Sequence, residues 1–568
     1  MPTGLAAARG LEPADAVFSG GEIFNPFACA WERVDFAVKD GYVVGIGEYE
    51  GEQEYDLSGA FVVPGLIDAH VHVESSLLAP AEYARLVLSH GTTTVIADPH
   101  EIANVCGAPG IDYMLDEGTR TPLDILVMLP SCVPATPLDV GGAVLTAADL
   151  ARFRGREGVI GLAEVMNVPG VLAGDEDLRA KMDLFPVIDG HAPFLSGKDL
   201  NAYIYAGARS DHECTTLAEA REKLLRGMYV MIREGSTEHN LRDLLPLANA
   251  CTAPRCCFAT DDRHADMLAG KGHIDDCIKK AVAYGLEVEQ ALRMATLSAA
   301  ERFGLHDRGA LAPGMLADFC VVDDPGRFEI LQTFKRGVEV VDPGYRSPAC
   351  PAAPLHARVP EPRDILLTGR GEARVIGIVP GQITTRDLRC SVDAADIPDT
   401  DRDILKAVVT DRYRASGSGV GLVHGFGLEV GAIAGSVSHD SHNIVAVGVD
   451  DADIVRAVGE VVRLGGGLAV VSSERRAGGP DLEKTRSVSS ADVTALPLEC
   501  AGLMSALPYD EVVRRLAALE EHARRLGAIA NPFMYLSFLA LTVIPEIRVT
   551  ERGVFDVGAF SDVPLFGE

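Results

Sequence analysis

Two histidines at the end of an apolar stretch constrain this chain more than any other feature. Residues 61–67 read FVVPGLI, and His70 and His72 follow almost at once. Residues i and i+2 of an extended backbone point to the same side, so both imidazoles would face one point. Neutral imidazole is the commonest metal ligand in proteins. The stretch therefore predicts a buried strand whose end helps to hold a metal ion.

The length and charge of the chain exclude several classes of function. A chain of 568 residues is too long for one compact core, so we expect two or three domains. The formal net charge of −31 disfavours nucleic acid and anionic membrane surfaces as partners. We find no apolar run of about 18 residues and no hydrophobic signal core, and we expect a cytoplasmic protein. The 12 cysteines follow no disulfide spacing and are interpreted as reduced, buried small hydrophobes.

Strand-like and helix-like segments alternate through the middle of the chain. Eight short stretches rich in apolar or β-branched residues are predicted to be strands: 61–67, 92–97, 125–129, 159–163, 185–189, 208–212, 228–233 and 256–260. Eight strands alternating with helices over about 200 residues predict a parallel (β/α)8 barrel. A single amphipathic helix over 287–305 is expected to close this barrel.

Metal-binding and charged side chains recur where these strands end. The active sites of such barrels lie at the C-terminal ends of their strands. The residues there are His70, His72, Asp98, Glu164, His191, His212, Arg233 and Asp261. One such residue is usually only a turn or cap residue, but four histidines and two carboxylates at five strand ends are hard to explain in that way. Six ligands exceed the need of one tetrahedral zinc, so we predict two metal ions with Glu164 as a candidate bridge.

The flanking regions predict further domains. Short strands over 1–60 and 306–346 are expected to form one small β-sandwich domain around the barrel domain at 61–305, and proline-rich residues 347–362 are expected to form a linker. Residues 363–568 are expected to form a C-terminal α+β domain.

Two segments of this C-terminal domain stand out. The sequence His439-Asp-Ser-His442 is either a solvated loop, or a lid or weak metal site that faces the barrel. Residues 531–545 are apolar on every side, which indicates core or a subunit interface and makes a homodimer plausible.

Several of these motifs resemble known families. The segment from Pro64 to His72 resembles the first strand of the amidohydrolase superfamily, and Leu311–Phe319 resembles its returning β-sandwich segment. A narrower resemblance, to the bacterial and archaeal adenine deaminase family, covers nearly the whole chain; its motifs lie at 72–76, 98–104, 164–167, 189–193, 195–201, 210–213, 231–236, 260–262 and 531–556. This resemblance implies a small-molecule substrate: adenine and water would give hypoxanthine and ammonia, in purine salvage or adenine catabolism. It also implies two divalent metal ions, usually Mn²⁺ or Fe²⁺, while the ligand types suit Zn²⁺ as well.

The same resemblance implies roles for individual residues. The metal ligands would be His70, His72, Glu164, His191, His212 and Asp261, although Asp262 also follows the strand and is an alternative to Asp261. Asp261 would take a proton from the attacking water, and Glu101 or Asp98 would pass a proton to the ring or the leaving group; Asp98 has the alternative role of holding its loop. Candidate substrate-binding residues are Glu74, Ser196, Lys198, Asp199 and Arg233. The alternatives are that Ser196, Lys198 and Asp199 cap a helix and that Arg233 pairs with a carboxylate.

Three other functions were weighed against this interpretation. Hydrolases of cyclic amides or ureides in the same superfamily commonly bridge their metals with a modified lysine, and this chain has Glu164 at that place. A metal-free scaffold relative would be expected to have lost several ligands, and all six are present. Single-zinc nucleobase deaminases combine HxE with PCxxC, and no PCxxC follows His72-Val-Glu74.

Overall fold

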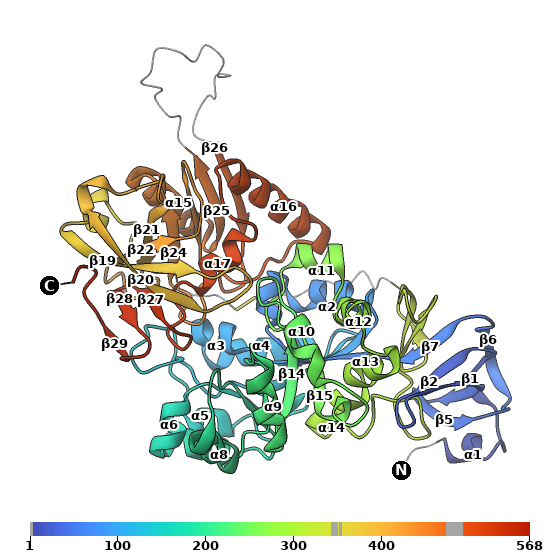
Figure 1. The fold of residues 1–568 in the computed structure, drawn as a ribbon. Coiled ribbons are helices and arrows are strands. Elements are labelled where there is room, and N and C mark those ends of the chain that lie inside the picture. The colour runs from blue at the N-terminus through green and yellow to red at the C-terminus, as the bar shows by residue number, and fades with distance from the viewer. Residues whose placement is uncertain (1–3, 342–349, 352–354, 473–491, 568) are drawn as a thin grey trace.

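The computed structural model describes residues 4–341, 350–351, 355–472 and 492–567. Figure 1 shows three parts in a row: a small β part that contains the N-terminus, a central barrel, and a C-terminal part at the opposite end. In the part of the chain that the structure describes, no helix is both long enough and apolar enough to cross a bilayer.

The central part is the predicted parallel barrel. Its strands are β8 (Leu66–Val71), β9 (Thr92–Ala97), β10 (Asp124–Leu129), β11 (Val159–Val165), β12 (Ile188–Gly190), β13 (Ser210–Asp211), β14 (Tyr229–Arg233) and β15 (Cys256–Ala259). The first five form one parallel sheet and the last three form another. A backbone hydrogen bond from Arg209 to Ile188 connects the two sheets on one side. A parallel bridge between Val71 and Asp261 closes the barrel on the other side.

Helices cover the outside of the barrel. They are α2 (Pro80–Leu88), α3 (His100–Cys106), α4 (Ala108–Gly118), α5 (Ala147–Ala151), α6 (Val168–Ala173), α7 (Glu176–Met182), α8 (Gly197–Ala206), α9 (Leu217–Leu225), α10 (Leu241–Leu244), α11 (Ala265–Lys271), α12 (Ile274–Ala283), α13 (Val288–Ala295) and α14 (Leu297–Phe303). The expected single helix over 287–305 is wrong, because α13 and α14 are separated at Thr296. The backbone there leaves the helical region, with φ −133° and ψ −93°.

The stretch expected as one barrel strand, 61–67, is also divided in two. Its first half, β7 (Phe61–Pro64), pairs with β16 (Phe319–Val322) of the small β part, and only its second half enters the barrel as β8. The change of sheet occurs at Gly65, where a Cβ atom would lie 2.1 Å from the hydroxyl of Thr93. Glycine therefore allows the close approach that the sequence pattern alone does not reveal.

The small β part consists of two packed sheets. One has the order β5-β4-β1-β6 and the other β18-β17-β16-β7-β2-β3. The remaining bounds are β1 (Ala14–Ser19), β2 (Glu22–Asn25), β3 (Ala30–Arg33), β4 (Phe36–Lys39), β5 (Tyr42–Ile46), β6 (Gly51–Asp56), β17 (Ile330–Lys335) and β18 (Val338–Glu339). Stacked and edge-on aromatic rings fill the space between the sheets, including Phe18, Phe36, Phe319 and Phe334.

The C-terminal part is built on an eight-stranded sheet with the order β20-β19-β22-β21-β24-β23-β25-β26. The strands are β19 (Arg370–Ile378), β20 (Thr385–Asp393), β21 (Ile404–Thr410), β22 (Ser418–His424), β23 (Ala432–Gly435), β24 (Ile444–Gly448), β25 (Gly467–Ser472) and β26 (Asp492–Pro497). Its helices are α15 (Asp451–Leu464), α16 (Tyr509–Arg525) and α17 (Pro532–Phe538). A small sheet follows, of β27 (Ile547–Thr550), β28 (Gly553–Asp556) and β29 (Ser561–Asp562).

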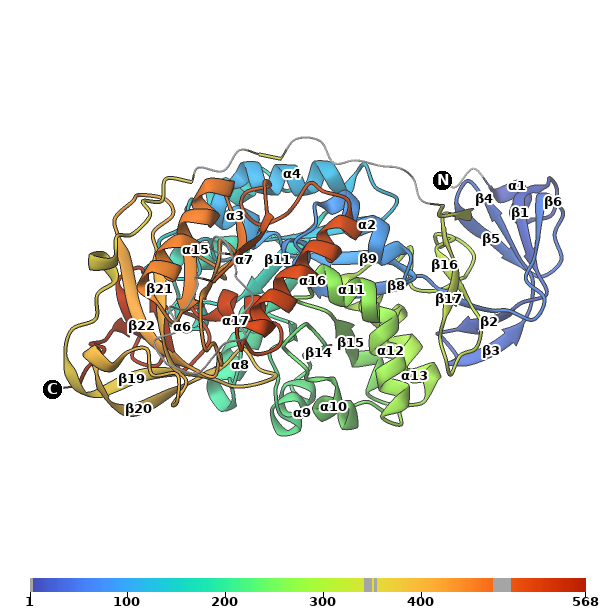
Figure 2. The ribbon, with the colours of Figure 1, turned by 90° about the horizontal axis from the view of Figure 1, so that it is seen from above.

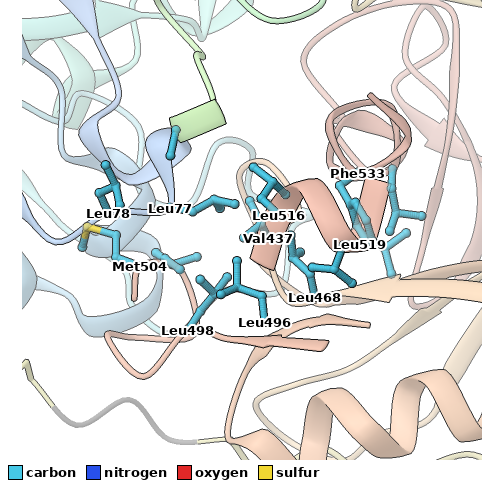
Figure 3. Packing of buried hydrophobic residues seen from close by; sticks show 14 of the residues in the cluster. Leu77, Leu78, Val437, Leu468, Leu496, Leu498, Met504, Leu516, Leu519 and Phe533 are labelled. Carbon is cyan, nitrogen blue, oxygen red and sulfur yellow. The ribbon is translucent and has the colours of Figure 1, made fainter. Parts of the chain in front are cut away.

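The C-terminal part docks on the barrel through an apolar interface. Leu77 and Leu78, which follow β8, pack with Met504, Leu498 and Leu516 of the C-terminal part (Figure 3). Backbone hydrogen bonds of 2.8 Å and 3.1 Å connect Ser505 to the same barrel segment. Figure 2 shows α16 and α17 between the C-terminal sheet and the barrel. Burial of these apolar side chains holds the C-terminal part close to the residues that follow β8.

Two expectations concern segments near residue 350. The predicted linker at 347–362 lies partly outside the described residues.

The expectation that all cysteines are reduced is wrong for Cys350 and Cys500, which form a disulfide across 150 residues of sequence. No local spacing could reveal such a pair, because the fold alone brings the two segments together. The other ten cysteines are free, and six of them are buried.

Candidate metal centre

The two histidines of the β8 end converge as their spacing predicts. Their Nε2 atoms lie 3.3 Å apart. Glu164 at the end of β11 brings Oε1 to 3.3 Å from Nε2 of His72, and Asp261 beyond β15 brings Oδ1 to 3.2 Å from the same atom. Both carboxylates also lie within 3.7 Å of the Nε2 atom of His70. All four side chains are buried.

The other two predicted histidines lie on the far side of Glu164. Nδ1 of His191 is 2.6 Å from Oε2 of Glu164, and Nε2 of His212 is 3.3 Å from the same oxygen. The ring of His212 stacks on His70 with 4.1 Å between ring centroids. One carboxylate oxygen of Glu164 therefore faces each pair of histidines, as a bridging ligand would require.

Hydrogen bonds at the far side of the rings fix the tautomers of His70 and His72. Nδ1 of His70 lies 3.2 Å from the carboxylate of Asp189, and Nδ1 of His72 lies 3.0 Å from the carbonyl oxygen of Asp98. Both oxygens are acceptors, so in the neutral rings each Nδ1 carries the proton and each Nε2 presents a lone pair. Histidines that ligate metals are held in this way.

When the rings are neutral, the centre therefore brings several electron-pair donors close together with no proton between them. Two imidazole lone pairs and two carboxylate oxygens face one another in a buried space, an arrangement that a cation stabilises. Groups of buried histidine and carboxylate atoms within 4.8 Å of one another include His72 with Asp98, His100 and Glu164, and His70 with His212 and Asp261. This donor set suits a divalent metal ion.

The pKa values of His70 and His191 show the same preference for positive charge. Burial opposes protonation of His70, yet the hydrogen bonds to Asp189 and Asp261 and the charge of Glu164 raise its pKa to about 10. Burial likewise opposes protonation of His191, and the charges of Glu213 and Glu164 raise its pKa to about 9. The carboxylates outweigh the burial of these rings, so the site attracts cations.

Asp261 brings Oδ1 within 3.5 Å of the Nε2 atoms of both His70 and His72, whereas Asp262 groups with His72 and Asp261 within 4.8 Å. Asp261 has a φ of 56°, which is uncommon for a residue with a side chain. Its amide donates to the carbonyl of His70 and its carbonyl accepts from the amide of His72, both at 3.0 Å. Asp262 instead accepts a hydrogen bond from the hydroxyl of Ser75. This geometry favours Asp261 as the ligand.

A small, half-open cavity adjoins the cluster, and the C-terminal part forms one of its walls. Its volume is about 30 Å³. From the barrel it is lined by His72, His100, Glu164, Met166, His191, His212, Glu213, Asp261 and Asp262, and from the C-terminal part by Ile383, His439, Asp440, Phe538, Leu541 and Val543. The solvated-loop interpretation of His439-Asp-Ser-His442 is therefore wrong, because these residues are buried against the barrel.

Comparison with known proteins identifies the family of this chain. The Amidohydrolase family model matches residues 61–340, and the Adenine deaminase C-terminal domain model matches residues 382–561. The chain is 84% identical to adenine deaminase of Methanoculleus marisnigri, covering 94% of this chain and all of that protein. It is 58% identical to adenine deaminase of Methanoregula boonei, covering 99% and 98% of the two chains. The chain belongs to the adenine deaminase family.

Solved structures resemble this chain more distantly. The N-acetyl-D-glucosamine-6-phosphate deacetylase of Mycobacterium smegmatis aligns with 57% of this chain and all of that chain, at 18% identity and a TM-score of 0.44.

Asp98 and Glu101, the carboxylates predicted to transfer protons, are buried. Neither is among the described residues that line the cavity. Both contact His100: Asp98 Oδ2 lies 2.9 Å from its Nδ1, and Glu101 Oε1 lies 3.4 Å from its Nε2. Nδ1 of His100 is also 3.3 Å from Glu164. No role was predicted for His100 from the sequence, because His100 follows Asp98-Pro99 at the start of α3 and is not part of an HxH motif at the end of a strand. The motif Asp98-Pro-His100 was the available signal.

The predicted substrate-binding residues are distributed unevenly. Glu74 is buried, with one oxygen accepting from the amide of Ile102 and the other without a hydrogen-bond partner. Arg233 donates to Asp261 at 2.7 Å and pairs with Glu213, so it holds a predicted ligand, as the alternative interpretation proposed. Ser196, Lys198 and Asp199 are exposed around the start of α8 and do not line the cavity. A role for these three in substrate binding stays a prediction.

Proposed function

We propose that this protein is an adenine deaminase, which converts adenine and water into hypoxanthine and ammonia in purine salvage or adenine catabolism. The observation that carries this proposal is the convergence of four histidines and two carboxylates in a chain that matches named adenine deaminases along nearly its full length. The substrate would be a small molecule, and we propose a cytoplasmic homodimer.

Two divalent metal ions are part of this proposal, most suitably Mn²⁺, with Fe²⁺ or Zn²⁺ as alternatives. His70, His72, Glu164, His191, His212 and Asp261 would hold them, with Glu164 between the two. A divalent ion lowers the pKa of a coordinated water toward 7 and so supplies hydroxide at neutral pH. The mixed imidazole and carboxylate donors suit any of these three metals.

The residues of this chain would move the protons. Asp261 faces the histidine pair and is proposed to take the proton that the attacking water loses. The ring nitrogen next to C6 gains a proton during the addition, and the amino group must leave as ammonia. Asp98 and Glu101 are proposed to support these transfers. Both contact His100, which lines the cavity, and Asp98, with Oδ2 2.9 Å from Nδ1 of His100, would act through its imidazole.

The C-terminal part is proposed to complete the substrate site. Ile383, Phe538, Leu541 and Val543 line the cavity opposite the metal cluster and offer an apolar face to a planar ring. A volume of about 30 Å³ holds roughly one water molecule, which is smaller than a purine. A purine would therefore need more space at this wall than the cavity offers.

A cyclic amide or ureide hydrolase remains the alternative within the superfamily. The presence of Glu164 instead of a lysine between the histidine pairs argues against it. A non-catalytic scaffold is disfavoured because the complete ligand set is buried and converges.

The test is turnover of adenine by protein purified without iron and supplied with Mn²⁺. The expected result is loss of adenine absorbance with one ammonia released for each hypoxanthine formed, and near-complete loss of this activity in Glu164→Gln. Two bound metal ions without any turnover of adenine would overturn the assignment. A panel of other purines and cyclic ureides would then identify the substrate.

A further inference from the structure

One histidine of the C-terminal part enters the cavity beside the barrel's metal cluster. His439 lies in the segment between β23 and β24 and is 3% exposed. Its ring stacks on Phe538, with 4.8 Å between centroids and 22° between planes. The amide of His439 donates to the carbonyl of Ser537 at 2.9 Å. Backbone and ring are therefore both held against α17.

The two nitrogens of His439 have different surroundings. Nδ1 contacts Oε1 of Glu101 on the barrel. Nε2 is buried and has no hydrogen-bond partner, although Oδ1 of Asp262 lies 3.8 Å from it, and the residue lines the cavity that also adjoins His72 and Asp261. A carboxylate on one nitrogen and a second nitrogen without a hydrogen bond form the arrangement by which enzymes orient an imidazole for proton transfer.

A second histidine of the same segment positions this carboxylate. Nδ1 of His442 accepts a hydrogen bond of 3.2 Å from the amide of Ser438, so Nε2 must carry the proton when the ring is neutral. Nε2 of His442 contacts Oε2 of Glu101 and therefore donates to it. Glu101 is thus held between His442 on one oxygen and His439 on the other. It does not itself reach the cavity surface.

We propose that His439 is the proton-transfer residue that faces the substrate, with Glu101 orienting its ring and His442 positioning Glu101. This inference deepens the proposed function and rests on it. It assigns the shuttle step to an imidazole from the C-terminal part, while Glu101, the carboxylate expected from the sequence for this step, acts through that imidazole. It also gives the C-terminal part a chemical role, because His439 belongs to that part and not to the barrel.

The step balances without an additional reactant. The oxygen of water bonds to C6 of adenine, and the C6–N bond to the amino group breaks. The electron pair of that bond leaves with the nitrogen, which takes the proton from Nε2 of His439 and departs as ammonia. One proton of the water restores the imidazole, and the other ends on the ring nitrogen next to C6, so that hypoxanthine carries C6=O and a protonated ring nitrogen. No group is oxidised or reduced.

The first experiment compares the metal-loaded wild type with His439→Gln. The expected result is a fall in kcat of about 10²–10³-fold with a change in KM of less than about five-fold, since proton transfer by a positioned side chain contributes about 10²–10⁴-fold. Metal content and thermal midpoint are expected to stay unchanged. The matched control is His239→Gln: His239 pairs with Glu234 at 3.0 Å outside the cavity, and its replacement should leave kcat unchanged.

A double-mutant comparison separates a catalytic unit from independent structural effects. Glu101→Gln alone should lower kcat nearly as much as His439→Gln, and the double variant should be no slower than the slower single variant, because residues that act as a unit are not additive. A kcat for His439→Gln within three-fold of wild type would overturn the proposal, as would fully multiplicative losses. A metal-loaded wild type that leaves adenine unchanged would instead overturn the proposed function itself.

Discussion

Replacing Asp189 by asparagine is expected to reverse the tautomer of His70. Oδ1 of Asp189 accepts from the amide of Gly190 at 2.9 Å and from the hydroxyl of Ser210. An asparagine would keep its carbonyl oxygen at that position because both neighbours donate. Its NH₂ group would then face Nδ1 of His70, which lies 3.2 Å from Oδ2 in the wild type. Nδ1 would have to accept, and the proton would move to Nε2, where the metal is expected.

The size of the effect follows from what holds the ring. Loss of an outer hydrogen-bond partner of a metal-binding histidine typically lowers metal affinity by about 10–100-fold, or about 1.4–2.8 kcal/mol. Asparagine should reach the upper end of this range because it favours the wrong tautomer. Asp189→Ala should cost less affinity, since a neutral ring that loses its partner can still choose either tautomer. The near-isosteric replacement is therefore expected to be the more harmful one.

The assay is the dissociation constant for Mn²⁺, measured by competition with a chelator, together with kcat at saturating metal. The control is Asp275→Asn, since Asp275 also contacts a histidine, His90, at 3.4 Å but outside the cluster. Thermal melting of the metal-free proteins separates a folding defect from a change in affinity. If Asp189→Asn bound Mn²⁺ as tightly as wild type, or more tightly than Asp189→Ala, the tautomer argument would be refuted.

Three further outcomes follow from other buried groups. The guanidinium of Arg548 donates to the carbonyls of Ile383, Phe538, Ile544 and Pro545, so Arg548→Lys should lower the free energy of unfolding by about 1–3 kcal/mol in urea titrations, and an unchanged value would contradict this. Burial raises the pKa of Glu74 from 4.5 to about 7, and the charge of Glu101 adds to this shift. Protonated Glu74 therefore stabilises the metal-free protein at low pH, and this stabilisation is lost as the pH rises from about 4.5 to 7. Glu74→Gln should therefore gain up to about 3 kcal/mol over wild type between pH 5 and 8, and a pH-independent difference would refute this sign. Leu516→Ala in the interface with the barrel should cost about 2–5 kcal/mol, whereas the same change at exposed Leu225 should cost little.

The barrel could be predicted from the sequence because its strands are short apolar runs that alternate with helices. The prediction missed the places where one residue changes the course of the chain. Gly65 divides the stretch 61–67 between two sheets, and Thr296 divides the last helical pattern into α13 and α14. Pro64-Gly65 was an available turn signal in the first stretch, whereas the apolar periodicity is continuous across Thr296 and contains no sign of that break. The Cys350–Cys500 disulfide depends on a contact between distant segments, which no spacing encodes.

The convergence of the six expected ligands could be predicted from the sequence, and their role as metal ligands stays a prediction. The six expected ligands lie at strand ends, and barrel topology alone brings strand ends together. His100 was missed because its position depends on how α3 begins after β9. The direction in which Glu101 points could not be predicted either, because its partners His439 and His442 come from more than 300 residues later in the chain. Packing between the barrel and the C-terminal part decides which groups face the cavity.

Activity measured against added Mn²⁺ tests the central claim most directly. Metal-free protein would be titrated with Mn²⁺, and the rate of ammonia release from adenine would be recorded with bound metal counted in the same samples. The account predicts that activity rises until two ions are bound per chain and then stays constant, and that Glu164→Gln reaches no such plateau. Full activity at one ion per chain, or activity that survives in Glu164→Gln, would contradict the account of two ions held on either side of Glu164.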